Sequence, residues 1–450
     1  MKDFTLAEIA KACNGEYVGD ESLKNTKITS VERDSRQVKN GSLFLAIKGE
    51  RVDGHDFIEK CFAQGAVCAL CEKAPENATK PCIVVPSTLD AVKKIGRAYR
   101  ERFDIPVIGI SGSVGKTSTK EMLYAVLSQK FKTHKTQGNL NNELGVPLTL
   151  LSMPEDTEAA VIEMGISDFG EMTRLSEMVQ PTICVLTIIG ECHLENLGDR
   201  DGVLKAKTEM FKNARENADF ILNGDDDKLS TVKTVNGKKP VFFGLDAKND
   251  FYAKNIKNSG DGKVLATLCF DNHNIDVEIP AIGTYMVTNA LAAAAAGKLL
   301  GLTDEEIANG VASYKTVGSR ANVINTGKIK IIDDCYNANP TSVRASLDTL
   351  SNLDGRKVAI LGDMKELGSE ELKLHFDTGV YAKSKGIGTV ITVGELAKEL
   401  AKGADGKAFD TIEDAKSEIL KTIKSGDVVL VKASHSMQFE NIVEFLKQNF

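Results

Sequence analysis

Hydrophobic and polar positions in the middle of the sequence alternate between short apolar runs and amphipathic stretches. A helical pattern covers residues 171–178, between two of these runs. The apolar runs are 106-PVIGIS-111, 159-AAVIEMG-165, 182-TICVLTII-189 and 219-DFILNGDD-226. Such alternation predicts parallel strands joined by crossover helices. We therefore expect an α/β domain over residues 101–314, with a β-rich insert around 250–282.

The same alternation begins again in the last third of the chain. Its apolar runs are 329-IKIIDD-334, 357-KVAILGD-363, 388-GTVITVG-394 and 427-DVVLVKA-433. A doubly wound sheet is expected, but the first run lacks the glycine-rich fingerprint of dinucleotide-binding folds. The pattern thus predicts a Rossmann-like C-terminal domain, residues 315–450, that can serve as a lid.

The first hundred residues mix shorter elements. A strand is expected near 43–49 and a helix near 57–65, which indicates a small α/β domain over residues 1–100. Together the three blocks predict a three-domain α/β protein, in keeping with a length of 450 residues.

Composition removes several classes of function. The net charge is −7 and basic runs are missing, which argues against nucleic-acid binding. The most apolar run, 290–302, is too short to span a bilayer, and the N-terminus has the pattern of an amphipathic helix, not a secretory signal. Nine scattered cysteines, an odd number, favour a reduced, cytoplasmic protein.

A candidate phosphate-binding loop follows the strand at 106–111. In 109-GISGSVGKTSTKEM-122 the motif is shortened, because Ile110 stands where the full pattern has its first glycine. Backbone N–H groups in such loops hold phosphates, the lysine neutralises them and the hydroxyl binds Mg²⁺. The alternative is a glycine turn that opens an ordinary helix. The candidate nucleotide-binding residues are Gly112, Ser113, Val114, Gly115, Lys116, Thr117 and Ser118.

Two polar residues are expected beside this loop, because ligands of open α/β sheets lie at the carboxyl ends of the strands. Glu163 ends one apolar run, and His193 follows another. Glu163 could hold Mg²⁺ with Thr117, and His193 could bind a second ion or orient a phosphate. The alternatives are a helix cap and a loop residue. Lys207 lies on the expected next helix, where spacing alone favours a surface lysine.

These motifs together resemble the Mur ligase family over essentially the whole chain. Any one of the matching segments would be weak, but their order and spacing are specific. They are Gly112–Thr117, 34-DSR-36, 42-SLFLAIKGERVDGHDF-57, 136-TQGNLNNELGVPLTLL-151, 163-EMGISDFGEM-172, 189-IGECHLENLGDRDGVLKAKTE-209, 288-TNALAAAAAG-297, 333-DDCYNANPTSV-343 and 361-LGDMKELG-368.

The resemblance implies an ATP-dependent amide ligase of cytoplasmic peptidoglycan precursor synthesis. It is strongest to the branch that joins D-alanyl-D-alanine to a UDP-N-acetylmuramoyl-tripeptide through an acyl phosphate. ATP and two Mg²⁺ ions are the expected cofactors, and a monomer is expected. The sequence leaves open whether lysine or diaminopimelate occupies the third peptide position.

The resemblance also assigns roles to single residues. Thr117 and Glu163 are expected on the first Mg²⁺ and His193 on the second, with Lys116 as a further catalytic group. Lys207 falls at the family's carbamylated lysine, where CO₂ converts a cation into an anionic metal ligand. The remaining positions are Asn289 for adenine, Arg320 and Asp334 for phosphate and ribose, Asn139 and Asn142 for the peptide substrate, and Ser35 and Arg36 for its UDP end.

Arg320 and Asp334 precede or open the C-terminal sheet, so the resemblance further implies domain closure about a hinge near residues 312–320. Two departures stand out. His435 occupies a position where this branch leads us to expect arginine, and 336-YNANP-340 stands in place of the Asp-Asn-Pro motif of ligases that add a diamino acid.

Two other interpretations remain. A folylpolyglutamate synthetase usually starts close to the phosphate loop, whereas about 100 residues precede it here. The other is a scaffold that binds a nucleotide but catalyses no reaction. The presence of Lys116, Glu163, His193 and Lys207 together argues against it.

Overall fold

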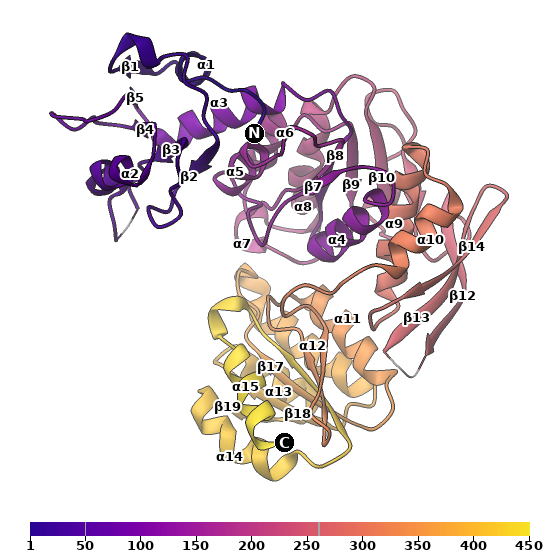
Figure 1. Ribbon diagram of the computed structural model, residues 1–450. Coiled ribbons are helices and arrows are strands. Elements are labelled where there is room, and N and C mark those ends of the chain that lie inside the picture. Colours follow the sequence, from indigo (N-terminus) through magenta and orange to yellow (C-terminus); the bar gives the residue numbers. More distant parts are fainter. Residues whose placement is uncertain (50, 260–261) are drawn as a thin grey trace.

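The computed structural model describes residues 1–49, 51–259 and 262–450, and it confirms the α/β prediction. Three separate sheets follow one another along the chain (Figure 1). The N-terminal and C-terminal sheets lie on different sides of the central one, which carries the phosphate loop.

The N-terminal sheet has the strand order β1-β5-β4-β3-β2. Its strands are β1 (Glu16–Val18), β2 (Ser30–Glu32), β3 (Ser42–Leu45), β4 (Cys68–Cys71) and β5 (Cys82–Val84). Four of them run parallel, and β1 is antiparallel to β5. Helices α1 (Leu6–Cys13), α2 (Ile58–Gln64) and α3 (Thr88–Arg100) complete this part.

The central sheet places the phosphate loop between two parallel neighbours. In the order β14-β13-β12-β11-β10-β9-β6-β8-β7, strand β6 (Val107–Ser111) lies between β8 (Ala159–Glu163) and β9 (Ile183–Leu186). The other parallel strands are β7 (Thr133–Lys135), β10 (Asp219–Asn223) and β11 (Val241–Phe243). The expected β-rich insert consists of the antiparallel strands β12 (Phe251–Ser259), β13 (Lys263–Phe270) and β14 (His273–Ile279), and residues 260 and 261 within it lie outside the described residues.

The central domain contains the helices α4 (Lys116–Leu127), α5 (Gly145–Leu151), α6 (Glu171–Val179), α7 (Leu194–Leu197), α8 (Arg200–Thr208), α9 (Tyr285–Leu299) and α10 (Asp304–Ala312). The alanine-rich run is α9, whose six alanines are fully buried and pack with α4 in one core. Within the described parts of the chain, no helix combines the length and the apolar character that a membrane span requires.

The C-terminal sheet has the order β15-β16-β20-β17-β18-β19. Its strands are β15 (Asn322–Asn325), β16 (Lys330–Asp333), β17 (Arg356–Gly362), β18 (Thr389–Val393), β19 (Lys407–Phe409) and β20 (Asp427–Lys432). Apart from β15, all run parallel. Helices alternate with these strands, as expected for a Rossmann-like domain. They are α11 (Pro340–Ser351), α12 (Glu371–Ser384), α13 (Ala397–Ala404), α14 (Ile412–Thr422) and α15 (Glu440–Asn449).

Strand β9 is shorter than the apolar pattern predicts. The run continues to residue 189, but the strand ends at Leu186. Beyond it the Thr187 hydroxyl donates to the Val114 carbonyl at 2.6 Å, and the Ile188 carbonyl accepts from the Ser113 N–H at 2.8 Å. The chain after Leu186 therefore bonds to the phosphate loop instead of continuing the strand.

The nine cysteines are buried free thiols, which agrees with the reduced state expected from their scatter. Cys68 and Cys71 on β4 belong to different hydrophobic clusters, as expected for side chains on opposite faces of a strand.

A buried arginine joins α3 to the central domain. Arg100 is fully buried, and its guanidinium donates to the carbonyls of Phe103 at 2.7 Å, Val179 at 2.9 Å and Gln180 at 3.3 Å. Burial lowers its pKa to about 10. The cost of burying this charge is offset by the three hydrogen bonds, which tie the end of α3 to the end of α6.

Arg100→Met should destabilise the protein by about 2–4 kcal/mol, because three buried carbonyls lose their donor. Arg97→Met is the matched control, since Arg97 is half exposed on the same helix and makes surface ion pairs with Glu101 and Glu177. Urea unfolding of both variants measures the difference. Equal free energies of unfolding for the two variants would contradict the role given to Arg100.

Candidate active site

The phosphate loop connects β6 to α4 through two glycines with positive φ. Gly112 has φ +153°, and a Cβ built there would lie 1.9 Å from the Thr187 hydroxyl oxygen. Gly115, with φ +84°, directly precedes α4. Glycine is required at Gly112 for space and at Gly115 for its backbone conformation. The turn therefore leaves the N–H groups at the start of α4 free of intrahelical partners, as in an anion-binding loop.

Lys116, the first residue of α4, folds back over this loop. Its ammonium donates to the Gly112 carbonyl at 2.7 Å and lines the cavity described below. Burial lowers the pKa of Lys116, and the charge of Glu163 partly opposes that change. A phosphate beside the loop would stabilise the charged ammonium.

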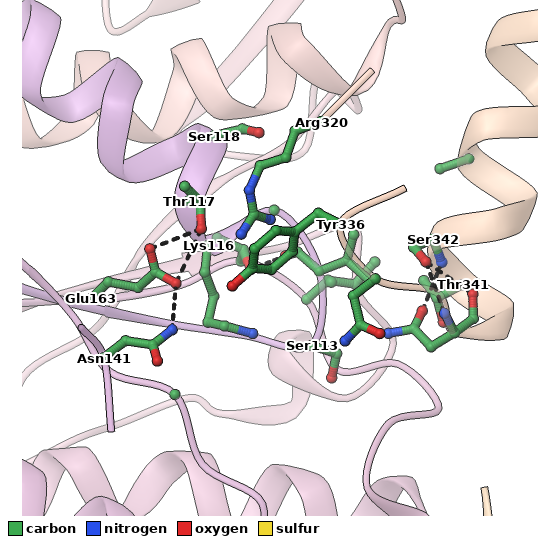
Figure 2. Close-up of a pocket in the computed structure, with 18 of the residues that line it drawn as sticks. Ser113, Lys116, Thr117, Ser118, Asn141, Glu163, Arg320, Tyr336, Thr341 and Ser342 are labelled. Carbon is green, nitrogen blue, oxygen red and sulfur yellow. Dashed lines mark hydrogen bonds between the residues drawn. The ribbon is translucent and has the colours of Figure 1, made fainter. Parts of the chain in front are cut away.

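Glu163 brings a carboxylate to the same place from the end of β8. Its side chain is 1% exposed and accepts hydrogen bonds from the Thr117 hydroxyl at 2.9 Å and from the Asn141 amide at 2.8 Å. The Lys120 ammonium lies 3.7 Å away. Figure 2 shows Thr117, Glu163 and Asn141 together on one side of the cavity.

The donor set fits a magnesium ion that is shared with a polyphosphate. A hydroxyl and a carboxylate are hard oxygen ligands, and Mg²⁺ commonly takes one or two protein ligands together with substrate phosphates. Among the described residues, no group of three or more His, Cys, Asp or Glu side chains is placed so that it could hold a metal ion. Thr117 and Glu163 therefore suit a nucleotide-bound Mg²⁺ better than a resident protein-bound ion.

His193 lies on the wall of the same cavity. It has φ +53° at the start of α7, and its Nδ1 lies 2.6 Å from Oε2 of Glu366 in the C-terminal domain, without good alignment for a hydrogen bond. The neighbouring imidazole lowers the pKa of Glu366. Because Nδ1 faces Glu366, Nε2 is the ring nitrogen left for a ligand in the cavity.

Lys207 is a buried lysine. It lies on α8, is 1% exposed, and burial lowers its pKa to about 8. The charge of Lys116 lowers this pKa further, and the charge of Glu171 opposes the change. The alternative of an ordinary surface lysine is therefore wrong, because a fully buried ammonium is costly without a partner.

The C-terminal domain contributes the opposite wall. The Arg320 guanidinium lies over the Tyr336 ring, 3.7 Å from its centroid, and both line the cavity (Figure 2). Asp334 lines it too, but its carboxylate already accepts from the Ser346 hydroxyl and from the Lys432 ammonium, each at 2.6 Å. Lys432 is 3% exposed, so this pair is held firmly in place.

Asn289 closes the cavity from the side of α9. Its Oδ1 accepts from the Thr119 hydroxyl at 3.0 Å, which ties α9 to the first turn of α4. The side chain is 7% exposed and lies on the wall with Tyr285 and Thr288. The contact with adenine that is expected for Asn289 stays a prediction.

One cavity of 590 Å³ joins these groups from the central and C-terminal domains. Most of the expected nucleotide and catalytic residues line it, namely Ser113, Val114, Gly115, Lys116, Thr117, Ser118, Glu163, His193, Asn289, Arg320 and Asp334. Gly112 and Lys207 are not among the residues that line it. A volume of this size suits a nucleotide or a ligand of similar size.

The residues expected to bind the peptide substrate are less well placed. Asn142 lines the cavity, but its side-chain oxygen accepts from the Gly145 N–H at 2.8 Å. Asn139 is exposed outside the cavity, whereas Asn141, between them, reaches Glu163. Ser35 and Arg36 lie in the N-terminal domain, away from the cavity, and exposed Arg36 pairs with Asp34.

Sequence reasoning missed Asn141, Tyr336 and Lys432. Lys432 ends strand β20 as Glu163 ends β8, so its position at the carboxyl end of a strand was a signal for it. Asn141 is one of three asparagines in a short turn, and only the turn geometry decides which of them points inward. Tyr336 carried no separate signal, since its role depends on Arg320.

Comparison with known proteins gives a consistent result along the chain. Three family models match: Mur ligase family, catalytic domain, over residues 27–102; Mur ligase middle domain over 110–297; and Mur ligase, glutamate ligase domain, over 319–435. The UDP-N-acetylmuramoyl-tripeptide–D-alanyl-D-alanine ligase of Bacillus subtilis is 36% identical, with 98% of each chain covered.

Solved structures agree with that match. A crystal structure of MurF from Acinetobacter baumannii superposes with a TM-score of 0.92 at 32% identity, covering 100% of this chain and 99% of that one. The MurF ligase of Thermotoga maritima, solved in complex with ADP, has a TM-score of 0.84 at 30% identity and covers 93% of this chain and 97% of its own.

Proposed function

Because this chain belongs to the Mur ligase family, we propose that it joins D-alanyl-D-alanine to a UDP-N-acetylmuramoyl-tripeptide at the expense of ATP. The product is a precursor of peptidoglycan, and ADP and phosphate are released. The observation that carries this function is the match to ligases of that activity over the full chain, including the N-terminal domain.

The cavity suits the chemistry of such a ligase. A carboxylate is a poor electrophile, so its oxygen first attacks the γ-phosphorus of ATP, the bond to the β-phosphate bridge breaks, and an acyl phosphate forms. The amino group of the dipeptide then attacks the acyl carbon, and the tetrahedral intermediate expels inorganic phosphate while the amine loses a proton. Both steps place negative charge beside the phosphate loop.

The residues of this chain have separate tasks in that sequence. Lys116 and the N–H groups of the phosphate loop bind the transferred phosphate and offset its repulsion from the substrate carboxylate. Thr117 and Glu163 would hold Mg²⁺, which supplies charge neutralisation to the phosphates when bound. His193, on the wall between loop and C-terminal domain, would bind a second cation or orient the transferred phosphate.

We assign the other components by the same family relation. Residues 1–100 would bind the UDP end of the substrate, with Ser35 and Arg36 as candidates, and residues 101–314 would carry out the ligase reaction. Residues 315–450 would bring Arg320 and Asp334 onto ATP by closing about residues 312–320. We expect a monomer, since a single chain supplies both walls of the cavity. We also expect a cytoplasmic location, which the scattered cysteines favour.

Lys207 is proposed to carry a carbamate. Carbamylation needs a neutral amine, and the neutral fraction of Lys207 grows as the pH rises through its lowered pKa of about 8. The change from +1 to −1 also removes an unpaired buried cation from a site that already holds Lys116. Buried position and lowered pKa support this proposal, and neither requires a metal to be in place.

Phosphate release from ATP should require the UDP-tripeptide and D-alanyl-D-alanine together with Mg²⁺. Either substrate alone should give little turnover, because no amine is present to complete the reaction or no carboxylate to start it. Single amino acids in place of the dipeptide serve as the control. Turnover with a single amino acid and not with the dipeptide would assign the chain to another branch, and none with any acceptor would indicate a nucleotide-binding scaffold.

Lys207→Ala should lower kcat by roughly 100-fold or more, the scale for loss of one electrostatic stabiliser of a transition state. Acetate or formate should restore part of the activity by taking the place of the carbamate. Lys207→Arg should not do better than Lys207→Ala, because a guanidinium remains cationic. Mass spectrometry of the native protein under CO₂ provides a reading independent of activity. Full activity of Lys207→Ala would exclude the carbamate.

A further inference from the structure

Residues 188–193 of the central domain contact the phosphate loop through Ser113. The Ser113 N–H donates to the Ile188 carbonyl at 2.8 Å, and the Gly190 N–H donates to the Ser113 hydroxyl oxygen at 2.9 Å. The Cys192 thiol also lies 3.0 Å from that oxygen. Ser113 is 8% exposed and lines the cavity. The backbone of this segment therefore follows the position of the phosphate loop.

The same segment contacts the C-terminal domain through Glu191. One oxygen of its carboxylate accepts from the Thr341 hydroxyl at 2.5 Å, and the other lies 3.7 Å from the Arg344 guanidinium. Thr341 is the second residue of α11, so the carboxylate also lies at the positive end of that helix. Only 22% of the Glu191 side chain is exposed, which makes the contact stronger than an ordinary surface ion pair.

Gly190 permits this contact by having no side chain. A Cβ built on Gly190 would lie 2.3 Å from the Thr341 hydroxyl oxygen. Its φ lies outside the left-handed region, so the backbone itself would accept alanine. The close approach of α11 is thus the reason that the structure shows for glycine at this position.

We propose that Glu191 is a positioning residue that docks the C-terminal domain onto the phosphate-loop side of the site. The residues that α11 and its preceding loop contribute to the cavity wall include Tyr336, Asn337, Thr341 and Ser342. The contact between Glu191 and Thr341 helps to set their distance from the phosphate loop, beside the contact between His193 and Glu366. Glu191 touches no reacting atom and acts through Thr341.

This inference deepens the proposed function and rests on it for its kinetic part. Residues 188–193 connect the loop that binds the transferred phosphate to the domain that covers it. A phosphate that holds Ser113 in place also holds Gly190 in place. It therefore holds the neighbouring Glu191 carboxylate, which accepts the hydrogen bond from Thr341 of α11. Docking and phosphate binding are therefore mutually favourable.

The test uses Glu191→Ala, Thr341→Val and the double variant, with Glu195→Ala as control. Thr341→Val removes the hydroxyl at nearly constant volume, and exposed Glu195 lies on the same stretch of chain. Fluorescence energy transfer between dyes on Glu216→Cys and Ser384→Cys reports the distance between the domains. These positions are exposed, whereas the nine native thiols are buried. The nucleotide is a non-hydrolysable ATP analogue with Mg²⁺.

With the analogue bound, each single variant should show a longer distance between the domains than the unchanged chain. Its kcat should fall about tenfold, the loss of a hydrogen bond to a charged acceptor. The dissociation constant of the UDP substrate should stay unchanged, since the N-terminal domain is not touched. The double variant should lose no more than Glu191→Ala alone, because that substitution already removes the hydrogen bond that Thr341→Val removes. Gly190→Ala should show the same longer distance.

An unchanged distance in Glu191→Ala, additive losses in the double variant, or an equal effect of Glu195→Ala would overturn the proposal. The distance measurement needs no turnover. Absence of ligase activity in the unchanged chain would therefore contradict the proposed function alone, while the distances still decide the role of Glu191.

Discussion

The hydrogen bond between Thr117 and Glu163 joins the two strands on which the site depends. Thr117 follows β6 and Glu163 ends β8, and the two residues meet because these strands are parallel neighbours in the sheet. With β9 on the other side of β6, the segment that carries His193 arrives at the same edge. A change of strand order would separate the phosphate loop from its carboxylate, and the C-terminal domain would have no formed site to cover.

Charge balance is the second constraint on this edge of the sheet. Lys120 and Lys207 are buried and Lys116 is partly buried, and burial lowers the pKa of both Lys116 and Lys207. Lys120 is paired, with Glu121 at 3.2 Å and Glu163 at 3.7 Å. Polyphosphate and a substrate carboxylate bring the opposite charge. A site built in this way binds anions strongly, and a carbamate on Lys207 would change its balance toward metal binding.

Much of the fold could be predicted from the sequence, because buried parallel strands leave a clear apolar pattern. Glu163 and the phosphate loop were also predictable, since both lie at strand ends. The direction of single side chains in turns was not. Asn141 and not Asn139 faces Glu163, and His193 faces Glu366 from another domain, because those orientations depend on turn geometry and on domain contacts. The burial of Lys207 was likewise invisible in its spacing.

In the proposed reaction, the cavity activates a substrate carboxylate by phosphoryl transfer before the amide bond forms. This step can be tested with tripeptide substrate whose terminal carboxylate is labelled with ¹⁸O, followed by mass spectrometry of the released phosphate. One labelled oxygen should appear in each phosphate, and the other should remain in the new amide. Phosphate without label, formed at the same rate as the ligated product, would contradict it.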